Sequence, residues 1–306
     1  MKTDEAIRKH KRRTLIPVAA FVLIGIAFTG LWLWDLMAPQ GPVEFDGDLA
    51  FQHVTAQMDL GPRIAGTDQA RQTARYIAGY LGQAGWQTEF QSFEYMGITV
   101  TNVIAKANVG AGPILIVGAH YDTRMRADQD PDHPDQPVPG ANDGASGVAV
   151  LLELGRSLEL RQVKHEVWLA FFDAEDNGNL DGWDWIVGSS YMADHLDADP
   201  QAMILVDMVG DADQQMYWDT NSDPGLSAVI WAQAARLGYA DHFIPAPRYA
   251  MLDDHTPFAR RGIPAVDIID FDYPYWHTLQ DTADKVSPDS LERVGRTLEA
   301  FLEGPS

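Results

Sequence analysis

Cysteine is absent from all 306 residues of the chain. Disulfide bonds and thiolate metal sites are therefore excluded, although export is not, because many exported bacterial proteins have no disulfides. Positive charge is also scarce, with 22 Lys and Arg against 44 Asp and Glu and a formal net charge of −22. A field of this sign repels phosphate backbones and excludes nucleic acid as a partner. It favours solubility, and attraction of cationic peptides is the alternative interpretation.

Long apolar runs are missing except for one near the N-terminus. Residues 14–34 carry no charge, include LIPVAAFVLIGIAFTGLWLW and follow a basic cluster at 9–13. About twenty apolar residues span a bilayer, and the basic side stays in the cytoplasm. We expect a single-pass signal-anchor in the membrane, with the rest of the chain outside the cytoplasm. A cleaved signal peptide is the competing interpretation, although its apolar core is usually only about 7–15 residues long.

The anchor divides the chain into four parts. We expect a cytoplasmic basic segment at 1–13, the transmembrane anchor at 14–34, a linker at 35–48 and one large domain at 49–306. The linker contains the stretch MAPQGPVEFDG, in which Pro and Gly disfavour regular structure. The remaining length suits a single domain rather than two.

Within that domain, apolar runs typical of strands alternate with stretches of helical spacing. Strands are expected at 87–95, 99–107, 113–117, 166–172, 202–206 and 265–269. Helices are expected at 49–58, 69–81, 148–158, 189–195, 225–237 and 288–302. Continuous apolar strands alternating with helices predict a three-layer α/β fold, in which helices cover both faces of a mostly parallel, twisted central sheet.

Five short motifs with acidic or histidine side chains lie along the domain: GAHYD, GANDGASG, FFDAEDNG, LVDMVGD and YWHTLQDT. Imidazole and carboxylate are the zinc ligands that remain when thiolates are absent. Four motifs follow strand-like runs, and ligands of open α/β sheets bind outside the carboxyl ends of the strands. The expected metal ligands therefore meet in one crevice; they are His120, Asp143, Asp176, Asp207 and His277. Glu175, a spare carboxylate beside Asp176, suits a general base.

Each motif also has a plainer interpretation. Asp143 precedes a predicted helix and is suited to cap it. Asp176 is open to interpretation as an ordinary loop acid, and His277 as a packed core histidine. Asp207, in contrast, lies in an apolar run, where a carboxylate without a cation is costly. Five further histidines match no motif and are interpreted as surface or packing residues: His53, His133, His165, His195 and His242.

From about residue 59 to residue 302, the motifs and their order resemble the zinc aminopeptidases with co-catalytic metals and their relatives, the glutaminyl cyclases. The resemblance implies one or two zinc ions and a peptide or protein N-terminus as substrate. It also implies a ligand set for each ion: His120, Asp143 and Asp207 for one, and Asp143, Asp176 and His277 for the other. Asp143 would bridge the two ions.

The same resemblance assigns roles to residues beside the ligands. Glu175 matches the general base of the family. Asp122, two residues after His120, would orient the His120 imidazole, because ligating histidines usually donate their other ring N–H to a fixed acceptor.

Three features resemble the cyclase branch more than the aminopeptidases. A long loop, NGNLDGWDWIV, follows Asp176 and offers Trp183 and Trp185 as substrate-pocket residues. The segment MLDDHTPFARRGIP carries Asp253 where aminopeptidases usually have Ser or Thr, and Trp276 precedes His277 as in cyclases. These features imply an acyltransferase that converts N-terminal glutamine to pyroglutamate with release of ammonia. Asp253 would then be a catalytic acid, hydrogen-bonded towards Asp207.

Other features favour a zinc aminopeptidase that hydrolyses N-terminal residues. GANDGASG is closer to the peptidase form of its motif, and Asp176 stands where cyclases commonly have Glu. Trp183 is further from Glu175 than the cyclase Trp is, and the three Trp residues are also open to interpretation as packing. A membrane-tethered, non-catalytic metal-binding domain is a third hypothesis, which the intact Glu175 and the five ligands disfavour.

Overall fold

The computed structural model describes residues 43–304, nearly all of the unit that begins at Glu44. The expected cytoplasmic segment, the anchor and most of the linker lie outside the described residues. Among residues 43–304, no helix is both long enough and apolar enough to cross a bilayer. The described unit begins with helix α2 (Gly47–Leu60), which Asp46 caps by accepting hydrogen bonds from the N–H groups of Asp48 and Leu49.

Six strands form the central sheet, in the order β1–β2–β4–β3–β5–β8. The strands are β1 (Gln87–Tyr95), β2 (Ile98–Ala107), β3 (Ile114–His120), β4 (Glu166–Phe172), β5 (Ala202–Asp207) and β8 (Ala265–Ile269). Strands β4, β3, β5 and β8 run parallel, as predicted. The β1–β2 hairpin joins β4 by an antiparallel pairing, so the sheet is mixed at that edge.

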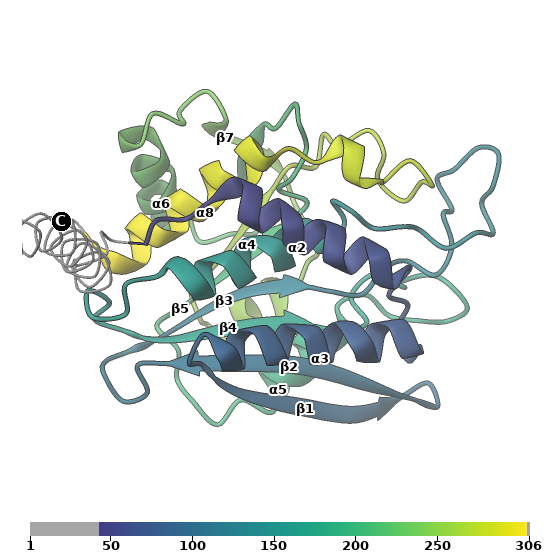
Figure 1. The fold of residues 1–306 in the computed structure, drawn as a ribbon, viewed down its shortest axis with the longest axis horizontal. Helices are drawn as coiled ribbons and strands as arrows, with labels where there is room; N and C mark the ends of the chain where they lie inside the picture. Colours follow the sequence, from purple (N-terminus) through teal and green to yellow (C-terminus); the bar gives the residue numbers. More distant parts are fainter. Residues whose placement is uncertain (1–42, 305–306) are drawn as a thin grey trace, which may run out of the picture. The chain divides into compact units, whose positions relative to one another are not determined.

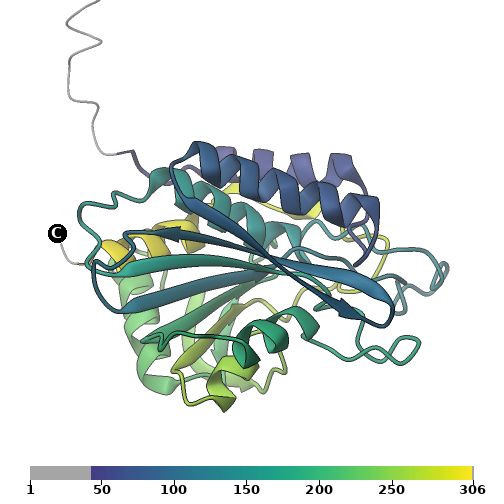
Figure 2. The same ribbon diagram turned by 90° about the horizontal axis from the view of Figure 1, so that it is seen from below.

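Both faces of the parallel part of the sheet are covered, which explains why β3, β4, β5 and β8 are apolar without alternation. The edge strand β1, in contrast, is largely exposed. In β4, Val167, Leu169 and Phe171 pack on one side, whereas Trp168 and Phe172 pack on the other. The first face carries α2, α3 (Asp68–Gln83), α4 (Ala145–Ser157), α6 (Pro224–Arg236) and α8 (Pro288–Glu303). The second face carries α5 (Val187–Asp194) and α7 (Thr256–Arg260). Figures 1 and 2 show these layers, which confirm the predicted α/β architecture.

Helix α4 lies unusually close to the sheet at its first turn. A Cβ atom at Gly147 would meet the backbone oxygen of Val206 at 2.2 Å and the Cβ atom of Ala119 at 3.0 Å. Only glycine allows this approach. Because Val206 and Ala119 each precede a predicted metal ligand, the contact brings the turn before α4, with Asp143, to the ends of β3 and β5.

The sequence pattern does not predict β6 (Met216–Asp219), β7 (Phe243–Tyr249) or α7. Strands β6 and β7 pair in a separate two-stranded sheet. The β7 sequence, FIPAPRY, contains two prolines, which remove backbone donors and argue against a strand. Helix α7 has five residues, too few to show a helical period. The other predicted elements all occur, with bounds that differ by a few residues at most.

Candidate metal centre

The carboxyl ends of neighbouring parallel strands bring the predicted ligands together. His120 is the last residue of β3, and Asp207 is the last residue of β5. Asp176 and His277 lie in the loops that follow β4 and β8, and Asp143 lies just before α4. Gly144, rather than Asp143, is the N-cap of α4, and no side chain caps this helix. The Asp143 carboxylate is therefore free to face the sheet edge.

Five side chains form two groups that share Asp143. In the first group, the His120 Nε2 atom lies 3.2 Å from Asp143 Oδ1 and 3.0 Å from Asp207 Oδ1. In the second, the His277 Nε2 atom lies 2.8 Å from Asp176 Oδ1 and 3.6 Å from Asp143 Oδ2. Each Asp143 oxygen thus belongs to a different group, which is the geometry that a carboxylate bridge between two metal ions requires.

The burial and charge of these groups fit a bound cation. All five side chains are buried. Within the described residues, Asp143 Oδ2 and Asp176 Oδ2 accept no hydrogen bond, although both atoms are inaccessible to solvent. Three carboxylates and two imidazoles at such depth are costly unless a cation neutralises them. Nitrogen and carboxylate oxygen donors suit zinc and similar divalent metals.

Asp122 connects the first group to the loop that carries the other acids. Its Oδ1 atom lies 3.6 Å from His120 Nδ1, on the ring edge opposite the metal-facing nitrogen. The same carboxylate accepts hydrogen bonds from the backbone N–H groups of Glu175 (3.0 Å) and Asp176 (3.3 Å). Asp122 therefore fixes the backbone of the acidic pair as well as standing beside His120.

Strained backbone surrounds the site. His277 itself adopts a left-handed conformation with φ of 57°, and so do Ala174 (58°) and Met208 (44°), next to Glu175 and Asp207. Non-glycine residues in this region cost on the order of 1 kcal/mol or more each and concentrate at functional sites. These conformations lie at His277 itself, directly before Glu175 and directly after Asp207, where the chain enters or leaves the site.

A cavity of about 190 Å³ lies beside the two ligand groups. Glu175 and Asp253 line it together with Asp143, Asp176, Asp207 and His277. Burial raises the pKa of Glu175 well above its ordinary value, and the neighbouring acid Asp176 adds to the effect while His120 opposes it. Burial also raises the pKa of Asp253 to about 7, helped by Asp207. Burial therefore favours the protonated form of both carboxyls relative to free Glu and Asp side chains.

Asp253 lies in the same cavity as Asp207. Asp253 Oδ1 accepts a hydrogen bond from the backbone N–H of Asp254 at 2.6 Å. The Asp253 and Asp207 carboxyls share the cavity, and their influence on each other is electrostatic.

Aromatic side chains wall the cavity. Trp276 stacks on the His277 ring, with ring centroids 3.7 Å apart, and Phe271 packs edge-on against Trp276. Trp185 lies parallel to the His277 ring at a centroid distance of 6.1 Å. Trp276 and Trp185 therefore lie where the sequence predicts pocket residues. Trp183 lines an adjoining groove instead and packs against Tyr95.

Residues 102–302, which contain all five motifs, match peptidase family M28. The chain belongs to this family. A glutaminyl-peptide cyclotransferase from Boiga irregularis is 26% identical over 265 residues, 72% of this chain and 70% of that protein. The crystal structure of Porphyromonas gingivalis glutaminyl cyclase is 33% identical with a TM-score of 0.80, covering 84% of this chain and 98% of that chain. That of a leucine aminopeptidase precursor from Bacteroides thetaiotaomicron is 30% identical with a TM-score of 0.82, covering 87% and 99%.

These similarities confirm the superfamily inferred from the motifs, including its glutaminyl cyclase branch. They also place an aminopeptidase precursor at a comparable structural distance from this M28 protein. Overall similarity therefore establishes an enzyme of this kind, while the side chains of the cavity carry the choice of reaction.

Arg124 is a site residue of this M28 protein that the sequence motifs do not reveal. Its Nε and Nη2 atoms donate to both carboxylate oxygens of Asp128, at 2.7 and 2.9 Å, and Nη1 donates to the backbone oxygen of Asp176 at 2.5 Å. Its guanidinium also lies over the Trp185 ring, 4.8 Å from the ring centroid. Asp128 in turn lies 3.5 Å from His277 Nδ1. One buried arginine thus positions a ligand loop, a ligand partner and a cavity wall.

Asp281, in the last motif, holds the Asp143 turn in place. Its carboxylate accepts hydrogen bonds from the backbone N–H groups of Asn142 (2.8 Å) and Asp143 (3.1 Å), and from the Tyr273 hydroxyl (2.7 Å). Asp281 holds this turn through contacts with residues far away in the sequence. Its position in the WHTLQDT motif is therefore the only sequence signal for this role. The buried Arg63 supports the same region by donating to the backbone oxygens of residues 121, 139 and 140.

Proposed function

We propose that this M28 protein is a zinc-dependent glutaminyl-peptide cyclotransferase, which converts the N-terminal glutamine of a peptide to pyroglutamate and releases ammonia. The observation that carries the proposal is the small aromatic-walled cavity that two further carboxyls, Glu175 and Asp253, line together with the ligand groups. The similarity to the Porphyromonas gingivalis glutaminyl cyclase supports it. A glutamine side chain with its own α-amine is small enough for a space of about 190 Å³.

His120, Asp143 and Asp207 would hold one zinc ion, and Asp143, Asp176 and His277 a second. When bound, zinc supplies a Lewis acid that polarises the side-chain amide oxygen of the substrate. The side chains that contact the ligands from behind then matter as much as the ligands themselves. Asp122 beside His120 Nδ1 and Asp128 beside His277 Nδ1 favour the tautomer in which each Nε2 is free to bind metal.

Glu175 moves the proton in this reaction. The α-amine nitrogen attacks the side-chain amide carbon, a new C–N bond closes the five-membered ring, and the old C–N bond breaks to release ammonia. The Glu175 carboxyl takes a proton from the attacking amine and returns it to the leaving nitrogen. Its burial beside Asp176 supports both halves of this exchange, because the raised pKa lets one carboxyl act as base and then as acid.

Asp253 stabilises the charge that develops as the neutral amine attacks the amide carbon. Its carboxyl lines the same space as Glu175, and the hydrogen bond from the Asp254 N–H fixes its orientation. Trp185, Trp276 and Phe271 hold the folded-back glutamine and exclude the water that a hydrolase must admit. Together these side chains favour cyclisation over hydrolysis.

Aminopeptidase activity is the second candidate function. Two complete ligand groups with Asp143 between them suit the co-catalytic pair of a hydrolase, whereas cyclisation needs only one ion. The similar leucine aminopeptidase precursor supports the same alternative.

One assay set separates the two reactions. The full-length protein, purified in detergent with zinc, is offered Gln-Ala and Leu-Ala peptides, and both ammonia and free amino acids are measured. We expect ammonia and a pyroglutamyl product from the glutamine peptide only. Free leucine without any cyclisation would contradict the proposal and establish the aminopeptidase.

We also propose that residues 14–34 anchor the protein in a membrane, with the M28 domain outside the cytoplasm. The support is the uncharged run behind a basic cluster. Full-length protein should sediment with membranes, resist extraction by alkaline carbonate and be digested by protease added from the non-cytoplasmic side. Release into the soluble fraction with a shortened N-terminus would favour the cleaved signal peptide instead.

A further inference from the structure

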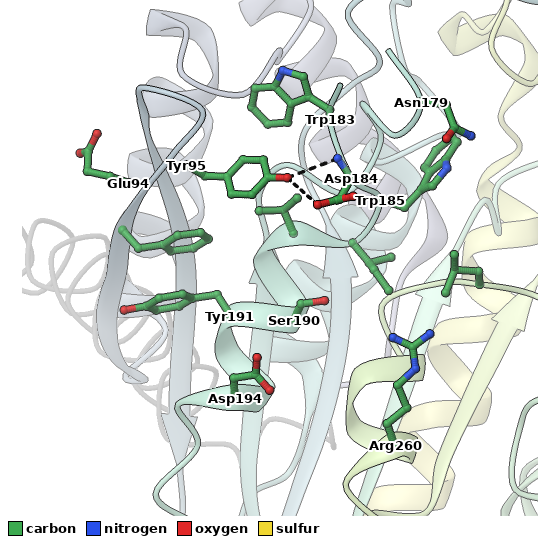
Figure 3. Close-up of a pocket in the computed structure, with 14 residues that line it drawn as sticks. Glu94, Tyr95, Asn179, Trp183, Asp184, Trp185, Ser190, Tyr191, Asp194 and Arg260 are labelled. Carbon is green, nitrogen blue, oxygen red and sulfur yellow. Dashed lines mark hydrogen bonds between the residues drawn. The ribbon is translucent and has the colours of Figure 1, made fainter. Parts of the chain in front are cut away.

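A second, larger hollow of about 550 Å³ adjoins the metal cavity; we call it the acidic groove. It lies between the outer end of β1, the loop that carries Trp183 and Trp185, α5 and α7 (Figure 3). Neither proposed reaction uses this space. Its volume is larger than an N-terminal residue needs.

The acidic groove and the metal cavity share part of their lining. Trp185 and Leu252 contribute to both. Leu252 is 50% exposed although it is apolar, and it directly precedes Asp253. A peptide whose first residue occupies the metal cavity therefore leaves it past Trp185 and Leu252 and enters the groove. Because an extended chain advances roughly 3.3–3.6 Å per residue, the second to fourth residues lie within reach of it.

Aromatic rings form one wall of the groove. Phe93 on β1 and Tyr191 on α5 stack with ring centroids 3.8 Å apart and an interplanar angle of 5°. Tyr95 packs against Trp183 and donates its hydroxyl to Asp184 Oδ2 at 2.8 Å. Figure 3 shows Tyr95 and Tyr191 on one side and Arg260 of α7 on the other. Flat apolar walls with a fixed carboxylate suit the long alkyl stem and charged head of a basic side chain.

The charge of the groove has the matching sign. Glu94, Asp184 and Asp194 line it with a single basic residue, Arg260. Asp184 and Asp194 are exposed and can meet a chain that enters, whereas Figure 3 shows Glu94 pointing outward from β1. The net charge of −22 for the whole chain adds a long-range attraction for cationic substrates.

We propose that the acidic groove binds the residues that follow the N-terminal residue of the substrate, and that it selects peptides with Lys or Arg over peptides with Asp or Glu at the second to fourth positions. The inference rests on the proposed function for the identity of the first residue. The inference adds a specificity site to the proposed cyclase, in which Asp184 and Asp194 determine the preference for basic peptides.

The test compares Gln-Ala-Lys-Ala, Gln-Ala-Glu-Ala and glutamine amide, which is too short to reach the groove. We expect kcat/KM to be about three- to tenfold higher for the Lys peptide than for the Glu peptide, a size typical of a few exposed charge pairs. In the double variant Asp184→Asn, Asp194→Asn, the ratio of kcat/KM for the Lys peptide to kcat/KM for the Glu peptide should fall towards one. The rate on glutamine amide, which does not reach the groove, reports any general effect of the variant on the metal cavity. The amide oxygen introduced at position 184 can still accept from the Tyr95 hydroxyl, so the packing is preserved.

A matched control removes two exposed acids elsewhere: Asp59→Asn on α2, across the sheet from α5, and Asp241→Asn on the α6–β7 turn. This double variant has the same change in net charge and should keep the preference for Lys. Loss of the preference in the control as well would mean that overall charge, not the groove, selects the peptide. Equal rates on both peptides with the unaltered protein would also overturn the inference.

A binding measurement distinguishes failure of the groove proposal from failure of the proposed cyclase activity. C-terminally labelled Lys and Glu peptides are titrated against the full-length Glu175→Gln protein and followed by fluorescence anisotropy, so that no turnover is needed. Preferential binding of the Lys peptide that Asp184→Asn, Asp194→Asn abolishes, without ammonia release by the unaltered protein, would refute the cyclase and keep the groove. Ammonia release without any preference in binding would refute the groove and keep the cyclase.

Discussion

Glu175 and Asp176 are adjacent in the sequence but differ in what their carboxyls face. Asp176 belongs to a ligand group with His277, whereas Glu175 lines the cavity and belongs to neither group. Removing its charge should therefore affect the reaction and not the metal. We expect Glu175→Gln to lower kcat by a factor on the order of a hundred or more, with unchanged zinc content by atomic emission.

The comparison with Asp176→Asn makes this prediction specific. That variant should lose zinc as well as activity, because it removes a ligand. If Glu175→Gln retains full activity, or loses zinc to the same extent as Asp176→Asn, the assignment of Glu175 as the proton carrier is wrong.

Arg124 acts through other residues, and its planar guanidinium is what they require. Lysine keeps the charge but cannot donate in parallel to both Asp128 oxygens while also reaching the Asp176 backbone. We expect Arg124→Lys to lower kcat/KM about tenfold, in the range usual for partners of metal ligands, and to weaken zinc binding in a chelator competition. Arg126→Lys is the matched control, because its ion pair with Asp181 is exposed and contributes little. Equal losses in both variants would contradict the positioning role.

At the scale of helices and strands, the parallel strands are buried on both faces, and this made the central part of the sheet predictable. Strands β4 and β8 have the predicted bounds, because continuous apolar runs end sharply at polar or turn residues. Strand β1 also has the predicted bounds, although its sequence QTEFQSFEY is largely polar and exposed. The gathering of His120, Asp176, Asp207 and His277 was predictable because parallel strands bring their carboxyl ends to one edge. Arg124, Asp128 and Arg63 were not, because their roles depend on how the loop at 124–139 folds back over the site, and loop conformation leaves no periodic signal.

Because α4 approaches the sheet closely at Gly147, replacing this glycine with alanine should destabilise the protein. The same replacement at an exposed helical glycine should stabilise it. Gly147→Ala places a Cβ atom against the backbone of Val206, so α4 must move. We expect a loss of about 1–3 kcal/mol in the free energy of unfolding, together with weaker zinc binding because Asp143 precedes this helix. Gly79→Ala on α3 meets nothing within 4 Å and should stabilise the protein by about 0.4–1 kcal/mol. Urea denaturation of both variants measures the difference, and equal effects would refute this account of the packing.

At the scale of the whole molecule, the excess of acid extends into the interior. Burial raises the pKa of Asp173, Asp270 and Asp281 to about 7 each, as it does for Asp253. These groups bind protons more tightly in the folded state than in the unfolded state. Between about pH 4 and pH 7 the folded protein therefore holds more protons, and its stability falls as the pH rises. His53, whose pKa burial lowers to about 4, opposes this trend below pH 6.5 but is a single group.

Bound zinc should oppose this loss of stability at higher pH. Chelated protein should lose stability from pH 5 to pH 8, by on the order of 2 kcal/mol or more in the free energy of unfolding. Zinc requires deprotonated carboxylates and neutral imidazoles, so its affinity for the two ligand groups rises over the same range, and ligand binding stabilises the folded state in proportion to the logarithm of that affinity. The gap in melting temperature between zinc-loaded and chelated protein should therefore widen with pH, measured by calorimetry at pH 5, 6.5 and 8. A gap that is constant or narrows would mean that the buried carboxylates are not the groups that the metal neutralises.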